Sequence, residues 1–251
     1  MTQAGSSVGV CVEHTHDVAV LKVTGLLNSA TYRTLRDAVI DAALDEPRAV
    51  IADVNGLSVP AESAWSVFTS ARWHVTAWPD VPILLVCQHS AYRRSITATG
   101  IARCVPLYSG REAALAAAIK RPLRDRRRLR TQLPARAVSL GLARALIGQW
   151  LTAWAQGCLI PVVGTIATIL VDNVLKHTDS APVLIVESLQ DTVVVAVEDD
   201  SQVPAGRLED ESGSETLSGL SIVSALCRVW RSTPKSSGKT VWALVGRENQ
   251  L

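Results

Sequence analysis

Two patterns of hydrophobic and polar residues alternate through the first half of the chain, and each pattern predicts one kind of secondary-structure element. Short apolar or alternating runs predict strands at residues 10–16, 18–25, 48–54, 81–87 and 102–108. Apolar residues at helical spacing predict helices at residues 28–44, 61–75, 90–100 and 109–120. Because strands and helices follow each other in turn, we expect a mainly parallel or mixed sheet covered by helices.

The second half of the chain has a different order. Two long helices are predicted at about residues 135–156 and 160–177, followed by two strands at 183–188 and 192–199. A polar and acidic loop over residues 202–218 precedes a helix that runs into a strand at 219–230 and a last strand at 239–246. No internal repeat is visible, so the halves are predicted to be unlike domains, at residues 1–119 and 132–251.

Composition narrows the class of protein. Of the 251 residues, 48% are hydrophobic and 19% are charged, which is typical of a globular chain and excludes a wholly disordered one. A formal charge of +2 is too small to indicate nucleic-acid binding by the whole molecule, and specific DNA binding is not expected. The five cysteines lie far apart and form no C-x-x-C pair, so neither a disulfide framework nor a zinc site is indicated, and we predict a reducing, cytoplasmic location.

Residues 120–131 are predicted to be a basic linker. Residues 120–130 carry seven basic side chains against the single Asp125. A solvated connector is the favoured interpretation, because no aromatic residues or nucleic-acid motif accompany the run. The alternative is a patch for nucleic acid or anionic lipid, whose binding would depend on salt.

Residues 145–171 contain no charged side chain, a stretch longer than the roughly 20 residues that cross a bilayer. Gln149, Gln156, Gly157 and Pro161 divide it into two shorter pieces. We therefore predict two core helices joined by a short break and no transmembrane span.

The second half resembles the ATP-binding domain of the GHKL (Bergerat-fold) family, and within it the bacterial anti-sigma-factor serine/threonine kinases. The resemblance covers about residues 132–247 and is carried by ILVDNVLKHT, VVVAVEDDS, GLSIV and SSGKTVWALV. It implies a two-layer α/β sandwich, bound ATP and Mg²⁺, and a tendency to form homodimers. It also implies these roles: Asn173 for Mg²⁺ between the phosphates, Lys176 and His177 as a basic pair, Asp199 as acceptor from the adenine amino group, Gly219 beside phosphate, and Gly238 and Thr240 near adenine.

Two departures from that family concern the chemistry. The family's general base, a glutamate four residues before the asparagine, is Ile169 here, and an isoleucine cannot accept a proton. Asp172 is the nearest carboxylate, but it is turned about 100° around the helix from Asn173. Ser201 and Leu217 stand where the family has glycines that let the backbone approach phosphate. We therefore predict impaired catalysis, as in a pseudokinase.

The first half resembles STAS domains, the family of anti-sigma-factor antagonists, over about residues 8–119. AVIADVNGLSVPAESAWSVF matches that family's central strand, loop and helix. In the family an Asp-Ser-Ser-Gly stretch opens the helix and its second serine is the phosphate acceptor, which implies Ser63 as the candidate acceptor, with Glu62 beside it. The alternative for Ser63 is an ordinary solvent-facing residue of a first helical turn.

Together the two resemblances predict a cytoplasmic bacterial regulator that works by partner switching. The expected partners are a sigma factor and STAS or anti-sigma proteins, with nucleotide occupancy tuning a lid at residues 203–218. The alternative is an active ATP-dependent kinase that phosphorylates a STAS-domain serine.

Overall fold

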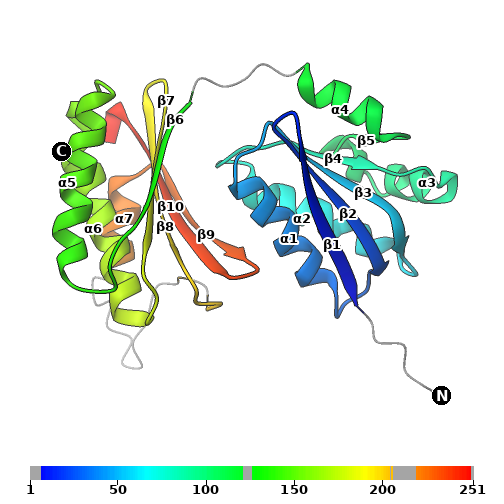
Figure 1. The fold of residues 1–251 in the computed structure, drawn as a ribbon, viewed down its shortest axis with the longest axis horizontal. Coiled ribbons are helices and arrows are strands. Elements are labelled where there is room, and N and C mark those ends of the chain that lie inside the picture. The colour runs from blue at the N-terminus through cyan, green and yellow to red at the C-terminus, as the bar shows by residue number, and fades with distance from the viewer. Residues whose placement is uncertain (1–6, 121–125, 204, 206–218, 250–251) are drawn as a thin grey trace. The chain divides into compact units, whose positions relative to one another are not determined.

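The computed structural model describes residues 7–120, 126–203, 205 and 219–249. The chain divides into two compact units, Met1–Leu123 and Arg124–Leu251. Each unit contains its own five-stranded sheet (Figure 1). Most of the predicted lid, including Leu217, lies outside the described residues.

The first unit is built on a mixed sheet in the order β1-β2-β3-β4-β5. Its strands are β1 (Val8–Thr15), β2 (Val18–Leu26), β3 (Ala49–Ser58), β4 (Ile83–Val86) and β5 (Leu107–Tyr108). Strands β1 and β2 are antiparallel, and the other pairs are parallel. His16 and Asp17 both have positive φ, which suits the two-residue turn that joins the antiparallel strands β1 and β2.

Helices follow the strands of the first unit as predicted. They are α1 (Tyr32–Leu44), α2 (Ser66–Val75), α3 (Ser90–Ala98) and α4 (Arg111–Ile119), with short 3₁₀ turns η1 (Glu62–Trp65) and η2 (Ile101–Arg103). Alternating residues of the sheet, among them Val18, Val20 and Ile51, pack with Ala114 and Ala118 of α4. The strand predicted at 102–108 is shortened to β5, because η2 occupies its first part.

The second unit is an antiparallel sheet in the order β6-β7-β8-β10-β9 with helices on one side (Figure 1). Its strands are β6 (Arg126–Gln132), β7 (Val183–Leu189), β8 (Thr192–Asp199), β9 (Val229–Lys235) and β10 (Gly238–Gly246). Its helices are α5 (Val138–Ala153), α6 (Ile160–His177) and α7 (Gly219–Leu226), with short turns η3 (Gly157–Leu159) and η4 (Arg247–Asn249). The predicted pair of long helices is therefore present.

The core of this unit lies between its sheet and its helices. Alternating valines of β8 (Val193, Val195 and Val197) pack in one cluster with Ile166 and Leu170 of α6. By length and composition alone, α6 with the preceding turn could cross a membrane, with a mean hydropathy of 2.0. Half of that stretch is buried, and its buried apolar side chains pack against the sheet and α5, as those of a core helix do.

The basic run is only partly a linker. Residues 126–131, predicted to be connector, belong to β6, which pairs with β7 along its whole length. Arg126 forms an ion pair with Glu187 at 3.0 Å, and Arg130 forms one with Glu198 at 2.8 Å. Acidic side chains on β7 and β8 thus pair with the arginines of a segment that has no hydrophobic alternation of its own.

Glu198 lies between two cations, because Lys235 contacts it at 3.1 Å in addition to Arg130. Burial would raise the pKa of this carboxyl, but the Arg130 hydrogen bond and the Lys235 charge outweigh burial and hold the pKa below its usual range. The resulting stabilisation is present at neutral pH and is lost as the pH falls through that lowered pKa.

Candidate functional site

A cavity of about 670 Å³ lies in the second unit, between α6, the ends of β8 and β10, and the start of α7. Asn173, Lys176, His177, Asp199 and Gly219, five of the residues predicted to bind nucleotide, line it together. Most of the remaining wall is apolar and includes these residues: Leu170, Val174, Val197, Val203, Ala205, Leu220, Ile222 and Val241. A mostly apolar cavity with a few polar groups is typical of a small-molecule site.

Helix α6 supplies one wall through residues spaced three and four apart. Ile169, Asn173 and His177 follow one another at intervals of four, and Asp172 and Lys176 form a second such pair. All five line the cavity. Lys176 Nζ lies 2.7 Å from an oxygen of Asp172, so this carboxylate already has a cation beside it.

Ile169 and Gly219 pack against each other where α7 begins. A Cβ atom at position 219 would lie 2.7 Å from Cγ2 of Ile169, which is too close for any side chain to fit without movement. Position 219 therefore requires glycine because of a contact with Ile169 itself. An apolar group fills the place where the resemblance implies a proton acceptor.

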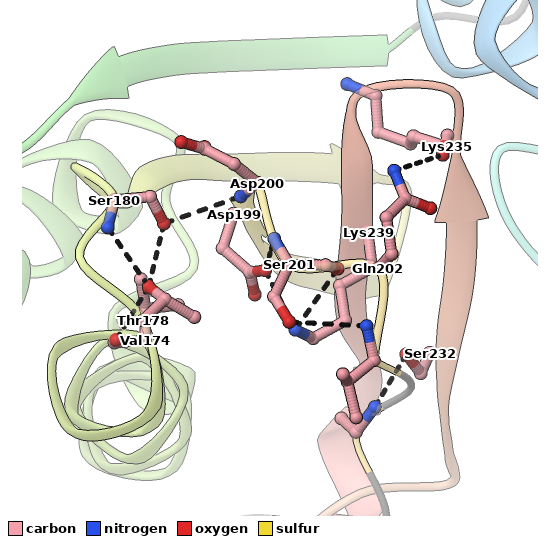
Figure 2. Close-up of polar contacts among 12 residues, drawn as sticks. Val174, Thr178, Ser180, Asp199, Asp200, Ser201, Gln202, Ser232, Lys235 and Lys239 are labelled. Atoms are coloured by element: carbon pink, nitrogen blue, oxygen red, sulfur yellow. Dashed lines mark hydrogen bonds and ion pairs between the residues drawn. The ribbon is translucent and has the colours of Figure 1, made fainter.

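Asp199 ends β8 and is the most deeply buried charge of the cavity, with a side chain that is 2% exposed. Its Oδ1 accepts hydrogen bonds from Lys239 Nζ at 2.8 Å and from the Ser201 backbone N–H at 2.8 Å (Figure 2). Lys239 Nζ also lies 3.5 Å from the Ser201 carbonyl oxygen. The carboxylate that the resemblance assigns to adenine is therefore half of a buried ion pair.

A chain of hydroxyl contacts fixes the end of α6 against the end of β8. Thr178 Oγ1 donates to the Val174 carbonyl oxygen at 2.9 Å, and its oxygen lies 2.8 Å from Ser180 Oγ. Ser180 Oγ in turn accepts from the Asp200 backbone N–H at 3.4 Å, as Figure 2 shows. These contacts hold the two walls that carry Asn173 and Asp199 at a set separation.

The chain after β8 is tied to the β9–β10 hairpin. Gln202 Nε2 donates to the Lys235 and Ser236 carbonyl oxygens at 3.4 and 3.1 Å. The Ala205 backbone N–H donates to Ser232 Oγ at 3.2 Å. Val203 and Ala205, the two described residues of the predicted lid, thereby form part of the cavity wall.

Gly238 and Thr240 are placed differently from the prediction, because neither is among the residues that line the cavity. In the register of β10 with β8, Thr240 pairs with Glu198, whereas Lys239 and Val241 pair with Asp199 and Val197. Side chains alternate along a strand, so Thr240 lies on the opposite face of the sheet. Gly238 instead allows β10 to approach the backbone of Asp199 closely.

Lys239 is the cavity residue that sequence reasoning missed. The hydrophobic positions Val241, Ala243 and Val245 all belong to the helix-covered core. Because side chains alternate along a strand, residue 239 lies on the same helix-covered face of β10 as these three residues. The alternation in the sequence could therefore have predicted the side of the strand on which Lys239 lies.

The cavity fits a nucleotide in its size and in part of its chemistry. Its volume lies within the range of about 300–1,000 Å³ that small-molecule sites have. Among the residues that the structure describes, no cluster of three or more His, Cys, Asp or Glu side chains could hold a metal by itself. Asn173 offers one amide oxygen, and Mg²⁺ in nucleotide sites takes few protein ligands beside phosphate oxygens.

The candidate phosphate acceptor of the first unit lies on a separate surface. Ser63 is exposed within η1, directly before α2, and Glu62 beside it is exposed as well. Trp65 anchors this turn, since it is 1% exposed and stacks on Phe68 with ring centroids 6.3 Å apart. Of the other two tryptophans nearby, Trp78 is buried and Trp73 is 59% exposed.

Comparison with known proteins finds a family match within the first unit. Residues 10–114, less than half of the chain, match the family model of the STAS domain. Among solved structures, an anti-sigma factor antagonist from Mycobacterium paratuberculosis is similar at 23% identity and a TM-score of 0.42, covering 47% of this chain and all of that one. The phosphorylated form of the Bacillus cell fate determinant SpoIIAA is similar at 17% identity and a TM-score of 0.33, covering 43% of this chain and 99% of that one. No curated protein matches the sequence.

Proposed function

We propose that this chain is a cytoplasmic partner-switching regulator in which a STAS domain binds regulatory proteins and the second unit binds a nucleotide without transferring its phosphate. The partners are a sigma factor and STAS or anti-sigma proteins. The observation that carries the proposal is the cavity that brings Asn173, Asp199 and Gly219 together in a chain that also contains a STAS domain. Binding, rather than turnover, would be the output of the second unit.

The residues around the cavity suit the two ends of a nucleotide. The apolar wall built from Val197, Leu220 and Val241 matches the faces of a base. At the other side, Asn173 would hold Mg²⁺, and the backbone N–H groups where α7 begins at Gly219 would face phosphate. Lys176 adds a positive charge at the exposed rim, and the His177 imidazole lies beside it.

Among the cavity residues that the structure describes, no unpaired proton acceptor stands at the position where the resemblance implies a general base. Ile169 packs on Gly219, and Asp172 is paired with Lys176. Loss of a general base lowers a rate by about 10²- to 10⁴-fold. We therefore assign the second unit to binding and treat Ser63 as a docking residue that another enzyme would modify.

The position of Ser63 suits that role. A phosphate on the exposed η1 turn would add nearly two negative charges next to Glu62, on a surface that a partner would cover. Such a change repels an acidic partner and attracts a basic one, which is the physical basis of a switch between partners.

Titration of the full chain with ATP tests the nucleotide site. In the presence of Mg²⁺ we expect saturable binding that Asn173→Ala weakens by roughly tenfold or more, since a contact to a charged group contributes about 1.5–3 kcal/mol. Isothermal titration calorimetry measures this. Gln149→Ala, an exposed amide of α5 outside the cavity, is the matched control and should bind as the parent does. Absence of binding of both ATP and GTP to the folded parent chain would refute the proposed site.

A phosphotransfer assay separates the binding module from the active-kinase alternative. With γ-labelled ATP and Mg²⁺ we expect little label on the parent chain and more on Ile169→Glu, by up to about 10²-fold if a base is restored. Ser63→Ala in the Ile169→Glu background locates the acceptor. Strong labelling of the parent chain that Asn173→Ala abolishes would establish the kinase instead.

A further inference from the structure

Asp199 and Lys239 present a charged pair to the cavity rather than a lone carboxylate. Both residues line it, their side chains are 2% and 11% exposed, and they meet at 2.8 Å (Figure 2). They are neighbours across β8 and β10, in directly opposed register. The pair is rigid, because two strands and the Ser201 turn hold it in place.

The contacts that the pair already makes determine what it offers a ligand. Within the described part of the chain, both contacts of Asp199 fall on Oδ1, so Oδ2 keeps its capacity to accept hydrogen bonds. An ammonium group has three N–H donors, and the contacts of Lys239 with Asp199 and Ser201 use two of them. A base in the cavity therefore meets an acceptor and a charged donor side by side.

We infer that this pair makes the cavity selective for a purine that carries a carbonyl oxygen at its position 6, a guanine nucleotide, over an adenine nucleotide. The inference rests on the proposed nucleotide site and concerns which base enters it. A lone carboxylate favours adenine, whose amino group donates to it. An ammonium beside that carboxylate favours a base with a strong acceptor next to its donors.

The two purines differ in how many of these groups they satisfy. Guanine places two kinds of N–H donor, at N1 and N2, opposite a carboxylate, and its O6 carbonyl is a strong acceptor for the ammonium. Adenine offers one amino donor and a weaker ring-nitrogen acceptor. The additional charge-assisted contact to O6 is the source of the preference.

Competition among three nucleotides on the full chain tests the inference. We expect GTP to bind at least about tenfold more tightly than ATP, since one well-placed pair of contacts to a base discriminates at that level. Inosine triphosphate, which keeps the O6 carbonyl and N1–H but lacks the N2 amino group, should fall between them. Calorimetric titration with each nucleotide and Mg²⁺ gives the three affinities.

Substitutions then assign the preference to the pair. The double variant Asp199→Asn, Lys239→Met removes both charges together and leaves no buried charge alone, and it should lose the preference for GTP. Lys239→Arg keeps a cationic donor and should retain it. Lys235→Met is the matched control, because Lys235 pairs with Glu198 on the other face of the sheet and should leave the ranking unchanged.

The outcomes test the base preference separately from the proposed nucleotide site on which it rests. ATP binding as tightly as GTP or more tightly would overturn the base preference and leave the nucleotide site standing. A preference for GTP that survives in the double variant would overturn the role of the pair. No binding of any of the three nucleotides by the folded chain would overturn the proposed site and this inference with it.

Discussion

Replacing Lys239 with Met is expected to lower the free energy of unfolding of the second unit by about 3–5 kcal/mol at neutral pH. The substitution keeps most of the volume but leaves the Asp199 carboxylate, which is 2% exposed, without its cation. A buried charge without a partner costs far more than the pair itself contributes. Hydrogen–deuterium exchange of β8 and β10, together with urea unfolding of the full chain, measures the loss in this unit.

Two further variants serve as controls for the same effect. Lys235→Met should cost less, because Glu198 keeps its 2.8 Å contact with Arg130. The double variant Asp199→Asn, Lys239→Met should recover a large part of the loss, because no charge remains buried. If the double variant is as unstable as the single one, the ion pair is not what holds this end of the sheet together.

Sequence pattern predicted most elements of both units because burial repeats along the chain at the period of each element. It failed at β6, where the sequence RRRLRTQ shows no hydrophobic alternation. This segment pairs with β7, and its arginines form ion pairs with Glu187 on β7 and with Glu198 on β8, one strand farther along the sheet. Such pairing across strands is not visible along the chain.

At the site, the sequence predicted which residues of α6 would lie together, but it placed one residue of β10 wrongly. Residues carried by α6 were brought together as expected, since helical spacing fixes their face. On β10 the resemblance implied Thr240 near adenine, whereas the register of the strand places Lys239, one residue earlier, on the cavity face. The contact between Ile169 and Gly219 joins residues fifty positions apart and could be found only in three dimensions.

Gly238→Ala should lower the free energy of unfolding by roughly 2–5 kcal/mol, since strained backbone and overpacking each cost about 1–3 kcal/mol. A Cβ atom at this position would lie 1.9 Å from the Asp199 carbonyl oxygen and 2.6 Å from Cα of Asp200. Gly238 also has a φ of 149°, where side chains are strained whatever the space. The clash is with backbone, so no rotamer change relieves it, and β8 and β10 must move apart.

Asp199 lies where β10 approaches β8 most closely, so Gly238→Ala should also weaken nucleotide binding. A substitution that only lowers the stability of the fold would leave nucleotide binding unchanged. Gly141→Ala provides the opposite control: nothing lies within 4 Å of a Cβ there, in an exposed part of α5, and the substitution should stabilise the chain by about 0.5–1 kcal/mol. Chemical unfolding of both variants and GTP titration at a temperature where both remain folded give the comparison. If Gly238→Ala is as stable as the parent and binds equally well, then the close approach of β10 to Asp199 does not set the geometry of the site.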